Sequence, residues 1–199
     1  GSSLGLAYSI VLTDAAIAPA FPSNTARGGV LYPIVLSVAQ GAGSKPEDPE
    51  SRYLGGYLMF CSMAGLAVSS ALWMTATSAN PIAVQIAQQN GLEIDFGKWL
   101  LASSVPSLAA ILLIPLIVAK LFPPRIGKTP EAPAAARREL AGMGGMSRDE
   151  WITAGTFVLM VAGWIFGGKF QLITTSVAFM GFGVLLFLGV ITIDDITTH

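Results

Sequence analysis

The chain has 199 residues, of which 53% are hydrophobic and only 12% are charged, and its formal net charge is −1. Soluble domains carry about 25% charged residues, so this composition excludes an ordinary soluble domain and predicts an all-α membrane protein. The near-zero net charge gives no reason to expect a nucleic-acid partner. A single cysteine, Cys61, excludes an intrachain disulfide.

Residues 1–40 predict a re-entrant helical hairpin with a substrate-binding tip. Its apolar segments, 4–21 and 30–39, are both shorter than the ~20 residues that a membrane span comfortably needs. The polar tip between them, residues 22–29, contains no acidic residue. Non-helical backbone at membrane depth is tolerated only where it is buried in protein or lines a cavity. We therefore expect the tip to line a cavity.

The tip carries side chains that suit an anion. Ser23, Asn24 and Thr25 supply two hydroxyls and an amide beside the free N–H groups of a helix that starts near residue 25. Arg27 is unfavourable inside a membrane and is therefore a functional candidate. The alternative is that the three polar side chains only cap the second helix. With Arg27 included, we favour an anion-binding tip.

The rest of the chain predicts about four transmembrane helices, one of them broken. The break, at 75–81, is rich in hydroxyl and amide groups and resembles the unwound helices of transporters. The alternative is an ordinary helix end at Asn80 and Pro81, followed by a helix at the membrane interface. The predicted segments are a connector (41–53), the broken helix (54–90), a transmembrane helix (98–121), a polar linker (122–150), two transmembrane helices (151–191) and a polar end (192–199).

The basic residues of the loops indicate the orientation. Eight Lys and Arg residues fall in 41–53 and 120–148, whereas only Lys98 and Lys169 lie on the other side if the spans alternate. An excess of positive charge marks cytoplasmic loops. We therefore expect the connector, the linker and the end of the chain on the cytoplasmic side or its organellar equivalent.

No catalytic or metal constellation is present in the sequence. His199 is the one histidine, Ser23 has no positioned base, and Cys61 has no histidine partner. We predict no enzyme activity and no cofactor. Asp14 lies roughly 13 Å before Ser23 along the helix. We expect it to face the mouth of the site or to pair with a neighbouring helix, and the alternative is a proton or cation site.

Four motifs resemble the divalent anion/sodium symporter family, and most closely its 2-oxoglutarate/malate translocator branch of plastids and bacteria. The motifs are the run 18–29, Gly43-Ser44-Lys45-Pro46, the run 52–58 and Asp149-Glu150-Trp151. The resemblance covers essentially the whole chain. It implies an N-terminal-half fragment of an inverted-repeat transporter in a bacterial inner membrane or a plastid inner envelope. It also implies a dicarboxylate substrate, such as 2-oxoglutarate or malate, and a homodimer when full length.

The resemblance assigns one half of a substrate cavity to this chain. The tip residues would hold a carboxylate, and residues of the break would complete the near half of the cavity. The implied substrate-binding residues are Ser23, Asn24, Thr25, Arg27, Thr77, Ser78 and Asn80.

The resemblance also bears on the coupling ion. Sodium-coupled relatives bind cations around the tip, so a sodium ion would lie near Ser23, Asn24 and Thr77 if one binds. However, the family's hydroxyl residue one turn before the triplet is Pro19 here. We therefore expect sodium-independent exchange, with the positive charge of Arg27 in place of sodium. The alternatives are a sodium-coupled symporter of di- or tricarboxylates or sulfate, and a structural membrane subunit without transport. A structural subunit would not need the tip and the break to lie together.

Overall fold

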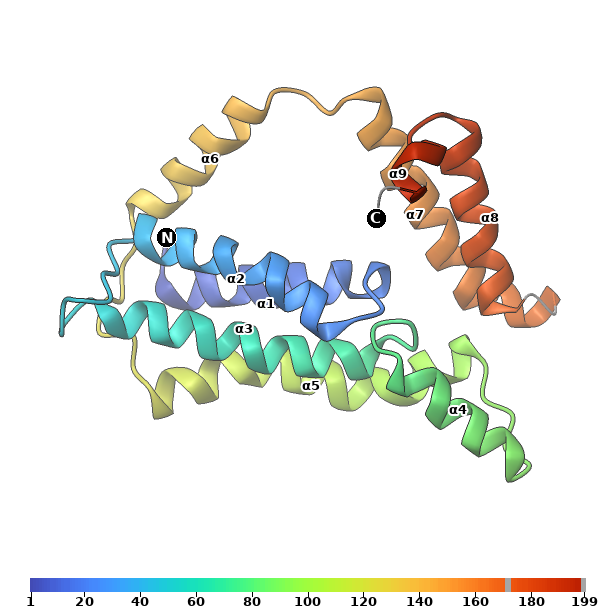
Figure 1. Ribbon diagram of the computed structural model, residues 1–199. Helices are drawn as coiled ribbons and strands as arrows, with labels where there is room; N and C mark the ends of the chain where they lie inside the picture. The colour runs from blue at the N-terminus through green and yellow to red at the C-terminus, as the bar shows by residue number, and fades with distance from the viewer. Residues whose placement is uncertain (171–172, 198–199) are drawn as a thin grey trace. The chain divides into compact units, whose positions relative to one another are not determined.

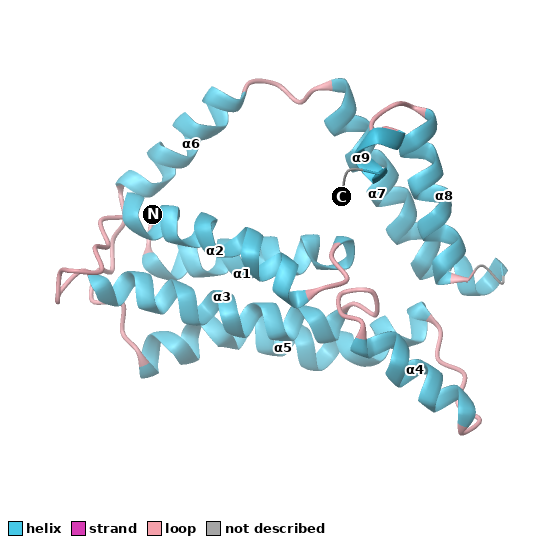
Figure 2. Ribbon diagram, in the orientation of Figure 1, coloured by secondary structure: helices cyan, strands magenta, loops and turns pink. Residues whose placement is uncertain are grey.

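The computed structural model describes residues 1–170 and 173–197, which form helices and no β-sheet (Figure 2). The all-α fold class predicted from the sequence is therefore confirmed. The chain divides into two compact units, Gly1–Glu93 with Leu101–Met143, and Ile94–Leu100 with Gly144–His199. Figure 1 labels the helices. The first unit contains α1 (Ser3–Ile17), the 3-10 turn η1 (Ala18–Ala20), α2 (Asn24–Gly41), α3 (Arg52–Leu72), α4 (Ala79–Gln89), most of α5 (Phe96–Leu121), and α6 (Glu131–Met143).

Helix α3 is the centre of the first unit, because α1 and α2 both pack against it. Val11 of α1 lies against Gly65 of α3, where an added Cβ would come within 3.1 Å of the valine. Ala39 of α2 lies near Gly55, at the start of α3. At the other end of α3, Trp73 contacts Ala15 of α1 and Ser70 contacts Arg27 of α2. Helix α1 therefore runs parallel to α3, and α2 runs antiparallel to it. The two form a helical hairpin whose tip lies near the C-terminal end of α3 (Figure 1).

The first helix and the turn that follows it are together long enough to cross a membrane. The turn η1 extends α1, and the stretch Ser3–Ala20 has the length and apolar composition of a membrane-crossing helix. Two more helices meet the same condition among the described residues, Arg52–Leu72 and Phe96–Leu121. The expectation that the first apolar segment is too short to span was therefore wrong. Re-entry of the hairpin stays a prediction.

The interruption expected in the second apolar stretch is present, with different limits. Helix α3 ends at Leu72, and residues 73–78 are non-helical before α4 begins at Ala79. Asn80 and Pro81, expected in the break, instead lie in the first turn of α4. A proline fits there because the N–H that it lacks would have no partner within the helix. The helix end expected as an alternative at Asn80 and Pro81 is thus a helix start.

Helix α5 continues through two internal prolines, Pro106 and Pro115. Tyrosines of the two neighbouring helices donate hydrogen bonds into this part of α5. The Tyr8 hydroxyl of α1 donates to the Leu112 carbonyl at 2.7 Å, and the Tyr57 hydroxyl of α3 donates to the Pro115 carbonyl at 3.0 Å. These hydrogen bonds join α1 and α3 to α5.

The end of the unit opposite the tip is also closed by specific contacts. The backbone of Ser3 donates to Gly127, and that of Thr129 donates to Gly1. The Arg125 guanidinium donates to both carboxylate oxygens of Glu50 at 3.1 Å and lies 3.9 Å from the ring centre of Tyr53. The connector and the start of the linker therefore lie at the same end of the bundle, which we call the base.

The second unit is a helical hairpin of its own. A reciprocal capping box of Ser147 and Glu150 starts its first helix, and these hydrogen bonds hold the pKa of the Glu150 carboxyl below its usual value. The Trp164 indole donates to the Thr174 carbonyl at 2.9 Å, and Gly181 lies directly beneath Met160. The elements are α7 (Arg148–Phe166), the 3-10 turn η2 (Gly167–Phe170), α8 (Thr174–Phe187) and α9 (Ile193–Thr197).

Helix α8 is shorter than the sequence suggested. It has 14 residues and ends at Phe187, and Gly189 follows in the left-handed conformation with φ 73°. Glycine readily adopts this conformation and commonly ends a helix. Neither α7 nor α8 is among the three candidate spans found in the described residues, so two crossings within 151–191 remain a prediction. The polar end predicted at 192–199 is described as far as residue 197.

Candidate substrate site at the hairpin tip

The three polar residues of the tip have different surroundings. Ser23 is the N-cap of α2, because its hydroxyl accepts a hydrogen bond from the Ala26 N–H at 3.3 Å. Asn24 is partly buried, and its side-chain oxygen accepts a hydrogen bond from the Ser70 hydroxyl at 2.5 Å. Thr25 is exposed. The capping role considered as the alternative therefore applies to Ser23, whereas Asn24 is tied to α3.

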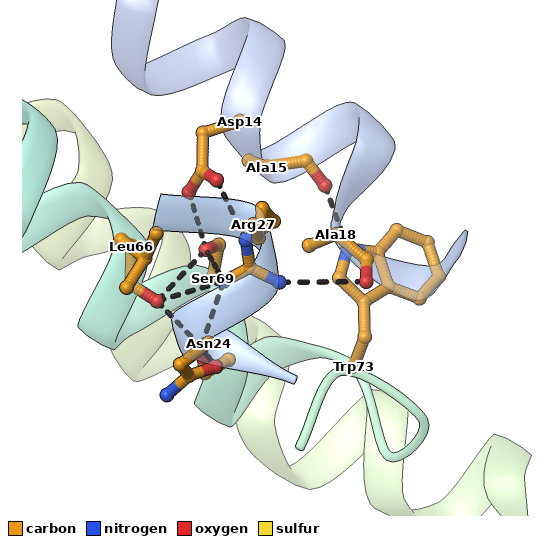
Figure 3. Close-up of polar contacts among 9 residues, drawn as sticks. Asp14, Ala15, Ala18, Asn24, Arg27, Leu66, Ser69 and Trp73 are labelled. Carbon is orange, nitrogen blue, oxygen red and sulfur yellow. Dashed lines mark hydrogen bonds and ion pairs between the residues drawn. The ribbon is translucent and has the colours of Figure 1, made fainter. Parts of the chain in front are cut away.

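Arg27 is completely buried between the hairpin and α3, with 0% of its surface exposed. Its Nε atom lies 2.8 Å from Oδ1 of Asp14, which is also 0% exposed. The Nη2 group donates to the Ser70 hydroxyl at 2.7 Å and to the Ser69 hydroxyl and the Leu66 carbonyl at 2.9 Å. Figure 3 shows these groups gathered around one guanidinium, which protein atoms surround in this conformation.

The same cluster contains the partners of Asp14. Besides the ion pair, its Oδ2 accepts a hydrogen bond from the Ser69 hydroxyl at 2.5 Å. The preferred expectation that Asp14 pairs with a neighbouring helix is confirmed. Sequence reasoning did not single out Ser69 and Ser70. The signal available in the sequence was a pair of consecutive serines inside a largely apolar helix, because buried hydroxyls need partners.

The break after α3 is attached to the end of the hairpin. The Trp73 indole donates to the Ala15 carbonyl at 2.8 Å, and the Thr75 hydroxyl donates to the Pro19 carbonyl at 3.1 Å. The side-chain amide of Asn80 donates to the carbonyls of Ser70 and Trp73, at 2.7 and 3.0 Å. Asn80 thus satisfies carbonyls that the end of α3 leaves without helical partners.

The structure therefore joins part of the predicted site. Asn24 and Asn80 both bind Ser70, one through its hydroxyl and the other through its carbonyl. Within the described residues, the hydroxyls of Thr25, Thr77 and Ser78 form no hydrogen bond with protein groups. Ser78 is exposed and Thr77 is partly buried. These three hydroxyls are therefore available to a ligand, whereas Arg27 is engaged.

A hollow near the base lies outside this site. Its volume is about 490 Å³, and none of the predicted substrate-binding residues lines it; its lining includes Tyr32, Arg52, Tyr53 and Phe122. No group of three His, Cys, Asp or Glu residues that could hold a metal ion occurs in the part of the chain that the structure describes. A sodium ion near Ser23, Asn24 and Thr77 would use neutral oxygens and stays a prediction.

Three long apolar helices, one of them followed by an interruption beside a polar hairpin tip, define a multi-pass membrane protein. Residues 1–199 match the family described as the sodium:sulfate symporter transmembrane region, and the chain belongs to this family. The resemblance stated from the sequence motifs is thereby confirmed.

Similar proteins of known name come from plants and bacteria. The chain is 41% identical over 197 residues to dicarboxylate transporter 2, chloroplastic, of Spinacia oleracea, and 42% identical to dicarboxylate transporter 2.1, chloroplastic, of Arabidopsis thaliana. It is 38% identical over 196 residues to "Putative malate transporter YflS" of Bacillus subtilis. These alignments cover 98% of this chain but only 35%, 35% and 41% of the three relatives. The chain therefore spans between about a third and two fifths of their length.

Proposed function

We propose that the full-length protein containing this chain transports dicarboxylates across a membrane. Membership of a symporter family and the names of the similar proteins support this proposal. The structural observation that carries it is that the helix break lies against the end of the hairpin: Thr75 donates to Pro19 just before the tip, and Asn80 and the tip residue Asn24 both bind Ser70. A structural membrane subunit has no need of that arrangement. Transporters place interrupted helices of this kind at their substrate.

The proposed contacts use donors that suit a carboxylate. The unengaged hydroxyls of Thr25, Thr77 and Ser78 would donate directly, together with the amide nitrogen of Asn24. The N-terminal N–H groups of α2, which Ser23 positions by its cap, add a favourable potential for an anion. Asn80 would hold the break in place, and Arg27 would act from beneath the tip. The resemblance places the second Ser-Asn-Thr hairpin of the family, which would hold the other carboxylate, beyond residue 199.

We also propose that transport is exchange of one dicarboxylate for another without sodium. Pro19, at the position where the family has a hydroxyl residue, supports this proposal, because its carbonyl accepts the Thr75 hydroxyl and its side chain has no oxygen. The ion pair changes the role first expected for Arg27. Its charge is balanced by Asp14 in this conformation, so it could neutralise a substrate directly only if the pair separated.

Counterflow in proteoliposomes of the full-length protein tests both statements. Vesicles loaded with unlabelled 2-oxoglutarate or malate should accumulate labelled 2-oxoglutarate, and replacement of sodium by choline should leave the initial rate unchanged. Loss of uptake in choline would favour the sodium-coupled alternative. Competition by sulfate but not by malate would favour a sulfate transporter. Absence of uptake for all of these anions, with the protein folded and inserted, would favour a structural subunit.

A further inference from the structure

We infer that Asp14 and Arg27 form a charge-neutral positioning pair, which acts through Ser70 to orient the side-chain amide of Asn24 toward the substrate. The inference rests on the proposed function, because it concerns the same tip. It adds Asp14, Ser69 and Ser70 to the mechanism. These three residues would support Asn24 without touching the substrate themselves.

The pair joins three elements at one buried point. Asp14 comes from α1, Arg27 from α2, and Ser69 and Ser70 from α3. An additional bond from Arg27 to the Ala18 carbonyl, at 3.4 Å, reaches the turn before the tip. An isolated buried charge is strongly unfavourable, so the carboxylate and the guanidinium hold each other in place. The tip is thus fixed to α3 within one turn of Asn24.

The direction of the hydrogen bonds follows from the chemistry of the groups. A guanidinium has only donors, so the Ser70 oxygen must accept from Arg27. A serine hydroxyl has one proton, and two acceptors lie at 2.5 Å from it, the Leu66 carbonyl and Oδ1 of Asn24. The Leu66 carbonyl already accepts from Arg27. Among the described residues, Oδ1 of Asn24 has no other donor, so we assign the Ser70 proton to Asn24.

This arrangement determines which end of the Asn24 amide a ligand meets. Oδ1 faces Ser70, and Figure 3 shows the amide nitrogen pointing away from the buried cluster. The nitrogen carries two donors, which a carboxylate can accept, whereas the oxygen would repel it. Rotation of the amide by 180° would exchange the two. The hydrogen bond from Ser70 opposes that rotation and leaves the donors for the substrate.

The inference differs from a direct role for Arg27 in substrate binding. A direct role requires the guanidinium to break contacts with some of its buried partners in each transport cycle. A positioning role keeps those partners unchanged and predicts that the substrate never contacts Arg27. The two roles therefore predict different effects on substrate affinity when the Ser70 hydroxyl is removed and the ion pair stays intact.

The test uses the full-length protein in proteoliposomes and measures KM and maximal rate for 2-oxoglutarate exchange. Ser70→Ala removes the donor to Asn24 and keeps Asp14 and Arg27. We expect the KM to rise about three- to tenfold, the range for loss of one such hydrogen bond, with little change in maximal rate. Ser62→Ala is the matched control, because Ser62 is a buried serine of the same helix that is not in the cluster, and its KM should equal that of the wild type.

A wild-type KM in folded Ser70→Ala would overturn the inference, even if the melting temperature fell, because a merely structural serine would behave in that way. If Ser70→Ala does not fold, Ser70→Cys replaces it. Its weaker thiol donor should give a smaller rise in KM, and an unchanged KM would again overturn the inference. If the wild-type protein exchanges no dicarboxylate, the proposed function fails instead, and the same KM comparison is made with the anion that is transported.

Discussion

At the scale of single residues, the feature that most constrains the tip is the buried pair of Asp14 and Arg27. Both side chains are fully enclosed, and their charges lie 2.8 Å apart with hydroxyls of α3 around them. The net charge of the pair is zero, so it places no uncompensated charge inside the membrane. Removal of one partner would leave the charge of the other uncompensated.

Asp14→Asn and Arg27→Gln should each lower stability strongly, because each leaves one buried charge without its partner, at a cost of about 3–5 kcal/mol. The double variant Asp14→Asn/Arg27→Gln should recover much of the loss, since no charge remains. The melting temperature and the yield of monodisperse protein measure this.

The same three variants separate two roles of Arg27. If the pair only positions the tip, the double variant should exchange 2-oxoglutarate faster than either single variant. If Arg27 neutralises the substrate directly, the double variant should be as inactive as Arg27→Gln although it folds. Wild-type stability of Asp14→Asn would contradict the pairing itself.

At the scale of elements, the interruption between α3 and α4 is held by hydrogen bonds rather than by chain flexibility. Trp73 and Thr75 bind the hairpin, and Asn80 binds the carbonyls at the end of α3. The loop at 73–78 thus has a defined place beside η1. Its hydroxyls at Thr77 and Ser78 depend on this attachment for their position.

Asn80→Leu should impair dicarboxylate uptake without abolishing expression. The substitution removes both donors to Ser70 and Trp73, and the loss of two hydrogen bonds of about 1 kcal/mol each corresponds to roughly a 30-fold decrease in kcat/KM if both bonds serve the substrate-bound state. Initial uptake rates at equal amounts of inserted protein measure the effect.

Asn90→Leu is the control for this experiment. Asn90 lies just after the other end of α4, and its amide donates to the Ile86 carbonyl at an exposed position. It should retain wild-type uptake. Normal uptake by Asn80→Leu would show that the break is only a helix end with no part in transport.

At the scale of the whole molecule, the first unit has two ends of different character. The base contains the connector and the start of the linker, which the Arg125–Glu50 ion pair joins, and the backbone of Ser3 ties the start of α1 to the same linker. This exposed pair adds little stability, but it shows that the basic segments share one end. That agrees with the orientation inferred from the distribution of Lys and Arg.

Cysteine labelling in intact cells or oriented vesicles tests this orientation. In a Cys61→Ala background, Lys45→Cys and Lys128→Cys should react with an impermeant thiol reagent from the cytoplasmic face, since both positions are exposed at the base. Asn90→Cys should react only from the opposite face. Labelling of positions 45 and 128 from opposite faces would contradict the shared base, and labelling of position 90 with them would contradict the crossing by α3.

The sequence by itself determined the class and the order of elements. Long apolar runs, the polar tip at 22–29 and the hydroxyl-rich interruption are local features, and each predicts its own secondary structure and membrane environment without knowledge of the rest. For the same reason, the segments that carry the proposed site were recognisable before the fold was known. The limits of the elements were not determined by the sequence. Pro81, for example, fits the start of a helix as well as a break.

Only the tertiary structure decided which groups meet. The partner of Arg27 is Asp14, 13 positions earlier on a different helix. Its link to Asn24 passes through Ser70, which lies 43 positions after Arg27. These meetings depend on the relative register and direction of α1, α2 and α3. Helix packing sets that register through contacts such as Val11 on Gly65, and no local pattern specifies it. An arginine that appeared to be a free cation in the sequence is therefore half of a neutral buried pair.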